Sequence, residues 1–104
     1  PENKIKVWLD REMKLKYPGI WKYSPPGGFF GLAGTPDRFY LYKGVFVAIE
    51  VKAEYNSPTE LQLKRLKEIH EAGCIVAVMR GKDFNKLHRI FRRIDERILL
   101  ATKK

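Results

Sequence analysis

Two apolar runs, at residues 45–52 and 74–79, flank a segment with helical spacing, and this order constrains the fold more than any other feature. The first run begins with apolar residues on both faces of a strand, which is typical of a central strand that is covered on both sides. A strand, a helix and a second strand in this order form a crossover unit. We therefore predict a parallel pair of strands joined through a helix.

The helix between the two runs has a recognisable start. We expect Ser57 to be its N-cap, Pro58 its first residue and Glu60 the partner in a capping box. Gly73 is expected to end it. Gln62 falls on the inward face in the first turn of this helix, which is an unusual place for a polar side chain.

The run at 45–52 also pairs with the segment before it. Residues 38–42 are rich in β-formers and are joined to it by Lys43-Gly44, a candidate tight turn, so the two segments read as an antiparallel hairpin. Asp37 stands at the start of the first strand and Glu50 near the end of the second. Strand direction alone predicts that these two carboxylates meet at one end of the sheet.

Lys52 shares a strand face with Glu50, because residues two apart point the same way. The Glu-x-Lys string occurs three times in the chain, but only Glu50-Val51-Lys52 lies in an apolar run. Charges in such a place are costly unless they are paired or bind a metal. The alternative is a simple ion pair on the strand, which if exposed would contribute about 0 to 1 kcal/mol.

Two amphipathic helices are predicted outside this unit, at residues 2–17 and 83–100. Glu12 falls on the apolar stripe of the first, either as a site residue or as an edge residue paired with a nearby basic side chain. A short strand is predicted at 20–23 and a glycine-rich loop at 24–35. The last helix has a basic face, which is either a solvated surface or a contact with phosphate.

Length, net charge and hydrophobic content limit the classes of partner that we expect. The chain has 104 residues, which suggests one domain over 1–104, and a net charge of +9 with pI near 9.8 favours an anionic partner. With no apolar run of membrane-spanning length and no visible signal peptide, we expect nucleic acid, no membrane and a cytoplasmic location. Cys74 is the only cysteine, so no disulfide forms within the chain.

These motifs together resemble the VRR-NUC family of the PD-(D/E)XK nuclease superfamily. The resemblance rests on Gly34-Thr35-Pro36-Asp37, on Ile49-Glu50-Val51-Lys52 and on Gln62 with its helix, and it covers roughly residues 5–82. It implies an α/β, restriction-endonuclease-like core in which helices flank a mixed central sheet. It also implies that this chain is similar to the stand-alone, phage-type members of the family. Those members look like homodimers that resemble Holliday junction resolvases.

The resemblance assigns roles to particular residues. It implies that Asp37, Glu50, the Val51 carbonyl and Glu12 are ligands of Mg²⁺ or Mn²⁺, and that Lys52 and Gln62 complete the catalytic set. Two neighbouring carboxylates favour the charged form of Lys52, so we expect it to orient the attacking water and stabilise transition-state charge. We further predict DNA contacts from Arg38, Lys64, Arg89 and Arg93.

The sequence thus predicts a metal-dependent DNA endonuclease, structure-selective and homodimeric, with no organic cofactor. Two alternatives stay open: a basic nucleic-acid-binding module that does not cleave, and a nuclease that acts on flaps or ends. Nothing in the sequence indicates a helix that reads bases, which favours recognition of shape and backbone.

Overall fold

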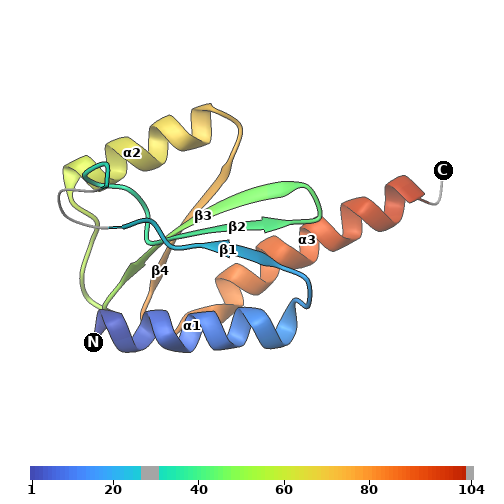
Figure 1. The fold of residues 1–104 in the computed structure, drawn as a ribbon, viewed down its shortest axis with the longest axis horizontal. Helices are drawn as coiled ribbons and strands as arrows, with labels where there is room; N and C mark the ends of the chain where they lie inside the picture. The colour runs from blue at the N-terminus through green and yellow to red at the C-terminus, as the bar shows by residue number, and fades with distance from the viewer. Residues whose placement is uncertain (27–30, 103–104) are drawn as a thin grey trace.

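The chain folds as a mixed sheet with helices on both faces (Figure 1), and the computed structural model describes residues 1–26 and 31–102. The elements in order are α1 (Glu2–Lys16), β1 (Trp21–Tyr23), β2 (Arg38–Tyr42), β3 (Val45–Lys52), α2 (Glu60–Glu71), β4 (Ile75–Arg80) and α3 (Phe84–Thr102). Part of the predicted glycine-rich loop, at 27–30, lies outside the described residues. The predicted α/β class with a mixed sheet is confirmed.

The sheet has the strand order β1-β2-β3-β4. The first two pairings are antiparallel and β3 pairs with β4 in parallel, so both the predicted hairpin and the predicted crossover are confirmed. Lys43 and Gly44 both have positive φ, 49° and 82°, in the two-residue turn between β2 and β3. That geometry matches the twist of the flanking strands and favours glycine at the second position.

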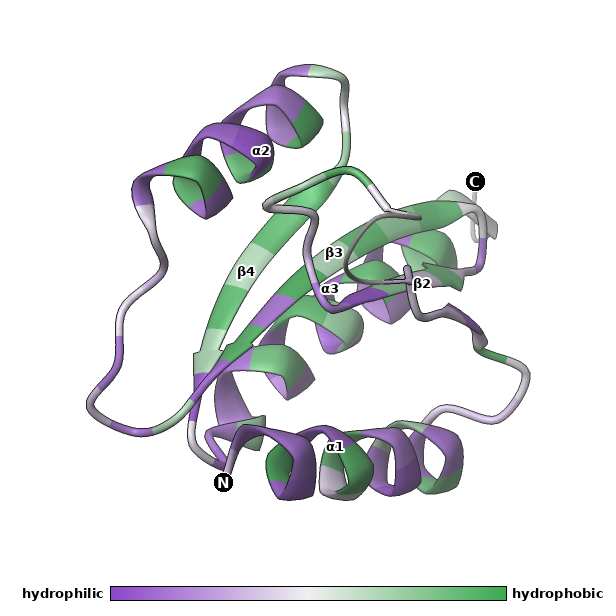
Figure 2. Cartoon of the chain, turned by 60° about the vertical axis from the view of Figure 1, so that its left-hand side comes forward, coloured by the Kyte–Doolittle hydropathy of each residue, from purple (hydrophilic) through white to green (hydrophobic). Residues whose placement is uncertain are grey.

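The helices divide the sheet into two faces. α1 and α3 cover one face and α2 covers the other (Figure 1), and β3 and β4 are hydrophobic along most of their length (Figure 2). The core lies on the α1 and α3 side, where Leu9, Met13 and Phe91 from the helices pack against Val47 and Ile49 of β3. None of the helices in the described part of the chain is long and apolar enough to cross a membrane.

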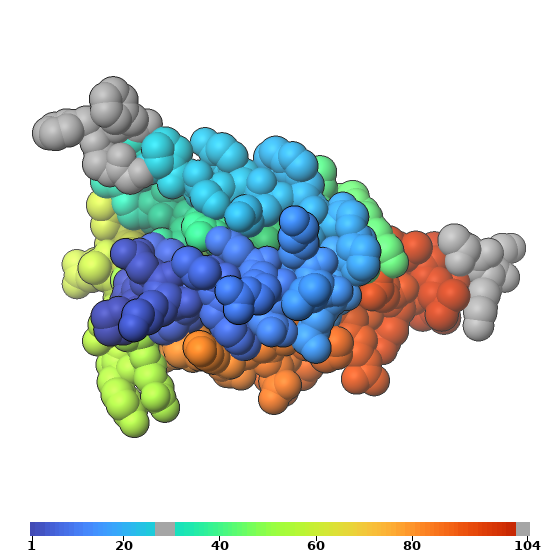
Figure 3. Space-filling model, turned by 60° about the horizontal axis from the view of Figure 1, so that its bottom comes forward, coloured from blue at the N-terminus to red at the C-terminus, as the bar shows by residue number. Residues whose placement is uncertain are grey.

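α1 and α3 lie side by side on their shared face (Figure 3). Trp8 of α1 meets Phe84 of α3 edge to face, with ring centroids 5.8 Å apart. Tyr17, just after α1, packs against Phe91 with centroids 5.0 Å apart. Because these ring contacts fix α1 along the sheet, the first turns of α1 are held at the end of the sheet where β3 finishes.

The predicted start of α2 is wrong by two residues. The N-cap is Thr59 rather than Ser57, because the Thr59 hydroxyl accepts a hydrogen bond from the Gln62 N–H at 3.2 Å. The Gln62 side chain in turn accepts from the Thr59 N–H at 2.9 Å, which completes the capping box. Pro58 therefore precedes the helix, and Gln62 takes the place predicted for Glu60.

Candidate active site

Asp37 and Glu50 face each other at one end of the β2–β3 hairpin, as strand direction predicts. Arg38 pairs with Ile49, so continuing the register by one residue sets Asp37 opposite Glu50 on the same face of the sheet. The Asp37 carboxylate accepts a hydrogen bond from the Val51 N–H at 2.8 Å, which holds it against β3. Glu50 is only 2% exposed, so its carboxyl group sits inside the protein.

The two carboxyl groups have opposite pKa shifts. Burial, then the hydrogen bond and the negative charge of Asp37, raise the pKa of Glu50 to about 8. Burial also opposes ionisation of Asp37, but hydrogen bonds to Glu50, the Val51 N–H and Lys6 outweigh it and hold the pKa of Asp37 below its ordinary value. At neutral pH the pair therefore shares one proton, with Glu50 as the acid and Asp37 as the carboxylate.

One oxygen of this pair lacks a donor. When Glu50 is ionised, its Oε2 is buried without a hydrogen-bond partner in the part of the chain that the structure describes. An unpaired buried carboxylate oxygen is costly, and a bound cation removes that cost. Carboxylate oxygens are ligands that suit Mg²⁺ and Mn²⁺, so Asp37 and Glu50 fit a divalent ion of this kind.

α1 contributes two residues to this end of the sheet that sequence reasoning missed. The Lys6 ammonium lies 3.0 Å from the Asp37 carboxylate. One turn earlier, Glu2 accepts a hydrogen bond from the Ala53 N–H at 3.2 Å, directly after β3. Their spacing of four residues puts them on one side of α1, and that is the signal that could have found them.

The predicted third carboxylate does not join the pair. Glu12 is half-buried, and it makes no hydrogen bond or ion pair within residues 1–26 and 31–102. It lies six residues beyond Lys6, about 9 Å farther along α1 and turned to another side. Across the described residues no group of three or more His, Cys, Asp or Glu is placed to hold a metal ion.

Lys52 is the last residue of β3 and lies on the same face as Glu50. Its positive charge lowers the pKa of Glu50, but by less than burial raises it. The Lys52 carbonyl accepts a hydrogen bond from the Gly81 N–H at 2.8 Å, which fixes the backbone at the strand end. Lys52 is half-buried, and its ammonium has no ion-pair or hydrogen-bond partner among the residues described, so the ammonium is free to meet a substrate.

Gln62 has a structural role that the sequence did not indicate. Its side-chain oxygen is used in the capping box with Thr59, so only its amide N–H groups are left to contact a substrate. The loop before Asp37 packs closely on the same turn of α2. Gly34 has a φ of 79°, and a Cβ there would lie 2.8 Å from the Leu61 side chain, so this position requires glycine.

Among the predicted DNA contacts, Arg38 is already paired. Its guanidinium donates two hydrogen bonds to Asp10, at 2.8 and 3.0 Å, and a third to the Asp37 carbonyl at 2.8 Å. This arrangement braces α1 against β2 beside the site and leaves little of Arg38 for phosphate. Lys64 is exposed on α2.

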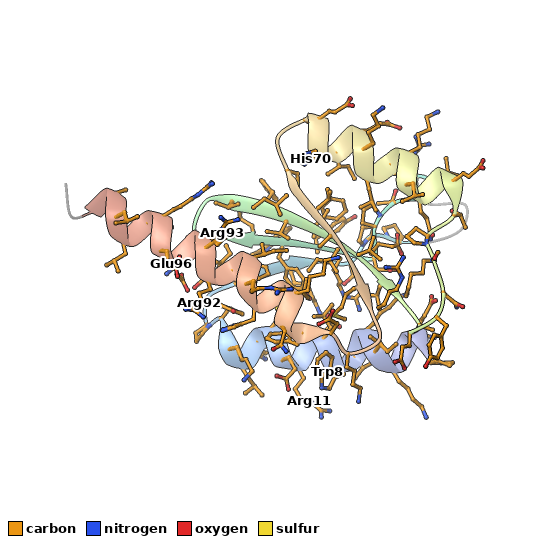
Figure 4. The ribbon with its side chains drawn as sticks, turned by 180° about the vertical axis from the view of Figure 1, so that it is seen from behind. Trp8, Arg11, His70, Arg92, Arg93 and Glu96 are labelled. Atoms are coloured by element: carbon orange, nitrogen blue, oxygen red, sulfur yellow. The ribbon has the colours of Figure 1, made fainter. Side chains whose placement is uncertain are left out.

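Arg89 and Arg93 line a groove of about 780 Å³ between α2, β4 and α3. Leu66, Val78 and Arg80 also line the groove, and Arg80, at the end of β4, pairs with Lys52 in the sheet. Figure 4 labels Arg92 and Arg93 on α3, which both line this groove. A smaller cleft of about 250 Å³ opens beside Asp37, lined by Lys6 and the loop that leads into β2.

No protein-family model matches the sequence, and no curated protein matches it. A solved structure described as a VRR_NUC domain protein does match the fold, with a TM-score of 0.66 and 23% sequence identity. The match covers 90% of this chain and 88% of that one. The two chains therefore share a fold, and the predicted resemblance is confirmed at that level.

Proposed function

We propose that this chain is a divalent-metal-dependent DNA endonuclease of the VRR-NUC type. The observation that supports this most is the Asp37–Glu50 pair, of which Glu50 is buried and Asp37 half-buried; the pair shares a proton and leaves one carboxylate oxygen without a donor when ionised. A structural ion pair needs one acidic and one basic side chain, whereas here two acidic side chains face each other. The shared fold with a VRR_NUC domain protein points to the same kind of chemistry.

Asp37 and Glu50, with the Val51 carbonyl, would hold Mg²⁺ or Mn²⁺. Bound there, the ion would supply an activated water and neutralise charge on the scissile phosphate. For the ion to bind, the two carboxyl groups must release the proton that they share, and the Lys6 ammonium must move away from Asp37. Metal binding is therefore coupled to the release of a proton and to the displacement of the Lys6 ammonium.

Lys52 acts at the phosphate rather than on the carboxylates. Its ammonium is placed at the end of β3, where it can orient the attacking water and stabilise charge that develops in the transition state. The amide N–H groups of Gln62 can donate to a substrate oxygen at the same end of the sheet. Glu2 of α1 lies at the end of β3, where it accepts from the Ala53 N–H, and we propose it in place of Glu12 as the acidic residue that the first helix contributes.

The substrate we propose is DNA recognised through its backbone. The net charge of +9 and the basic groove with Arg89 and Arg93 support this, since phosphate contacts give affinity without reading sequence. A homodimer would present two sites and suit a symmetric four-way junction. Flaps and strand ends are the alternative substrates.

A DNA-binding module that does not cleave is the second candidate. It is favoured by the Lys6–Asp37 ion pair, which satisfies part of the acid pair without a metal. Nicking of plasmid DNA that depends on Mg²⁺ or Mn²⁺ separates the two candidates.

The test compares cleavage of a four-way junction, a flap, a matched duplex and single strands in Mg²⁺ and in Mn²⁺. Paired symmetric nicks on the junction support structure-selective cleavage by a dimer. Equal cutting of all four substrates contradicts selectivity but keeps the nuclease, and binding without any cutting supports the second candidate.

A further inference from the structure

The face of the sheet that holds Glu50 is the one that α2 covers over β4, and this face continues across β2 and β1. Residues opposite each other in an antiparallel pair share a face, so the register extends this face strand by strand. Two rows of side chains cross it beyond the acid pair: Ala48–Phe39–Tyr23 and Phe46–Leu41–Trp21. α2 packs over β4, which is the edge strand farthest from β1 in the sheet.

Trp21 and Tyr23 form an exposed aromatic platform on β1. Trp21 is 54% exposed and Tyr23 is 47% exposed, although large aromatic side chains are usually well buried. Their rings are nearly parallel, with an interplanar angle of 8° and centroids 6.2 Å apart. Exposed apolar surface of this kind marks a site of interaction.

The platform lies close to the acid pair on the same face. Tyr23 of β1 pairs with Phe39 of β2, and Phe39 lies two residues after Asp37. The backbones of Tyr23 and Asp37 are therefore about 8 Å apart. Trp21 lies two residues farther from Asp37 along the same strand. Neither of the two rows holds an acidic residue, so a polyanion that crosses them meets no carboxylate within the rows.

We propose that the aromatic platform binds unpaired nucleobases of the substrate by stacking. Every base has a π-face, so two parallel exposed rings accept successive bases whatever the sequence. The net charge of +9 favours a polyanionic strand over this surface. The inference rests on the proposed function for the nature of the ligand, and it makes the substrate class DNA with unpaired nucleotides next to the scissile phosphate.

A second copy of the chain is a less suitable occupant. β1 has only three residues, which is short for a strand that pairs edge to edge with another.

Fluorescence anisotropy in the presence of EDTA tests the platform without cleavage. The probes are a labelled oligothymidylate and a labelled blunt duplex of equal length. Trp21→Ala and Tyr23→Ala should each weaken oligothymidylate binding at least about fivefold more than duplex binding. Trp21→Phe should restore most of the preference, whereas Trp21→Leu, which keeps apolar bulk without a π-face, should not.

Leu15→Ala is the matched control, because Leu15 on α1 is 69% exposed and lies far from this face. An unchanged ratio of single-strand to duplex affinity in the alanine and leucine variants overturns the proposal. A change in oligomeric state on size exclusion, with no change in that ratio, also overturns it and identifies a contact between copies.

The same measurements separate this inference from the proposed function. A wild-type protein that binds oligothymidylate through Trp21 and Tyr23 but cuts nothing in Mg²⁺ or Mn²⁺ supports the platform and contradicts the nuclease. A wild-type protein that cuts DNA, with platform variants that keep its single-strand preference, contradicts the platform alone.

Discussion

The Lys6 ammonium lies 3.0 Å from the Asp37 carboxylate, so α1 brings a cation to the acid pair at the end of β3. The lysine neutralises the ionised member of the pair, while Glu50 keeps the proton. A divalent ion must therefore displace both a proton and an ammonium. This relationship sets how the protein should respond to pH, to metal and to substitution.

Glu50 should make the metal-free protein less stable as the pH rises. Its folded-state pKa is raised, so its contribution is fully present below its ordinary value of 4.5 and is lost as the pH rises through about 8. We expect the wild type to lose on the order of 4 kcal/mol of unfolding free energy between pH 5 and 8.5 and Glu50→Gln to lack this loss, as measured by urea unfolding in EDTA. The exposed Glu54→Gln is the control, and an unchanged slope in Glu50→Gln would falsify the shared proton.

Lys6→Met should bind Mn²⁺ more tightly than the wild type. The substitution removes a cation that competes for Asp37, although it also removes an ion pair and should lower the free energy of unfolding by about 1 kcal/mol. Isothermal titration with Mn²⁺ measures the affinity. Lys4→Met on the exposed side of α1 is the control, and weaker Mn²⁺ binding by Lys6→Met than by this control would contradict competition at Asp37.

Lys52→Ala should lose cleavage and largely keep DNA binding. An ammonium that stabilises transition-state charge contributes to the chemical step, so we expect a fall of about 10²- to 10³-fold in the single-turnover rate. DNA affinity measured under the same conditions shows whether binding survives. A rate close to that of the wild type would refute the role assigned to Lys52.

Thr59→Ala should destabilise the protein by about 1 kcal/mol, because it removes the side-chain oxygen that caps α2. Ser57→Ala should cost much less, since Ser57 makes only a 3.5 Å contact with Arg80. Thermal or urea unfolding of the two variants compares them directly. If Ser57→Ala is the more destabilising, the cap is at the position that the sequence indicated.

The strands and their pairing could be predicted from the sequence because periodicity and turn chemistry act locally. The run at 45–52, the Lys43-Gly44 turn and the convergence of Asp37 on Glu50 follow from such local signals, and the structure confirms them. The start of α2 was harder to predict, since Ser57 and Thr59 both head plausible capping boxes. Only the hydrogen bonds of Thr59 and Gln62 decide between them.

The contribution of α1 to the site could not be predicted. Helical phase indicates that Glu12 lies on the inward side of α1, but it does not indicate where along the sheet each turn of α1 lies. That position depends on packing between elements distant in sequence, such as Trp8 on Phe84. The structure consequently places Glu2 and Lys6, and not Glu12, at the end of β3.

Nicking of supercoiled plasmid across a Mg²⁺ titration, with wild type and Asp37→Asn side by side, tests the central claim most directly. We predict that the wild type nicks DNA only with the metal present and that Asp37→Asn loses the activity at every Mg²⁺ concentration, while the exposed control Glu54→Gln keeps it. Nicking by Asp37→Asn with the wild-type rate and the same Mg²⁺ dependence would contradict a metal-dependent active site at Asp37 and Glu50.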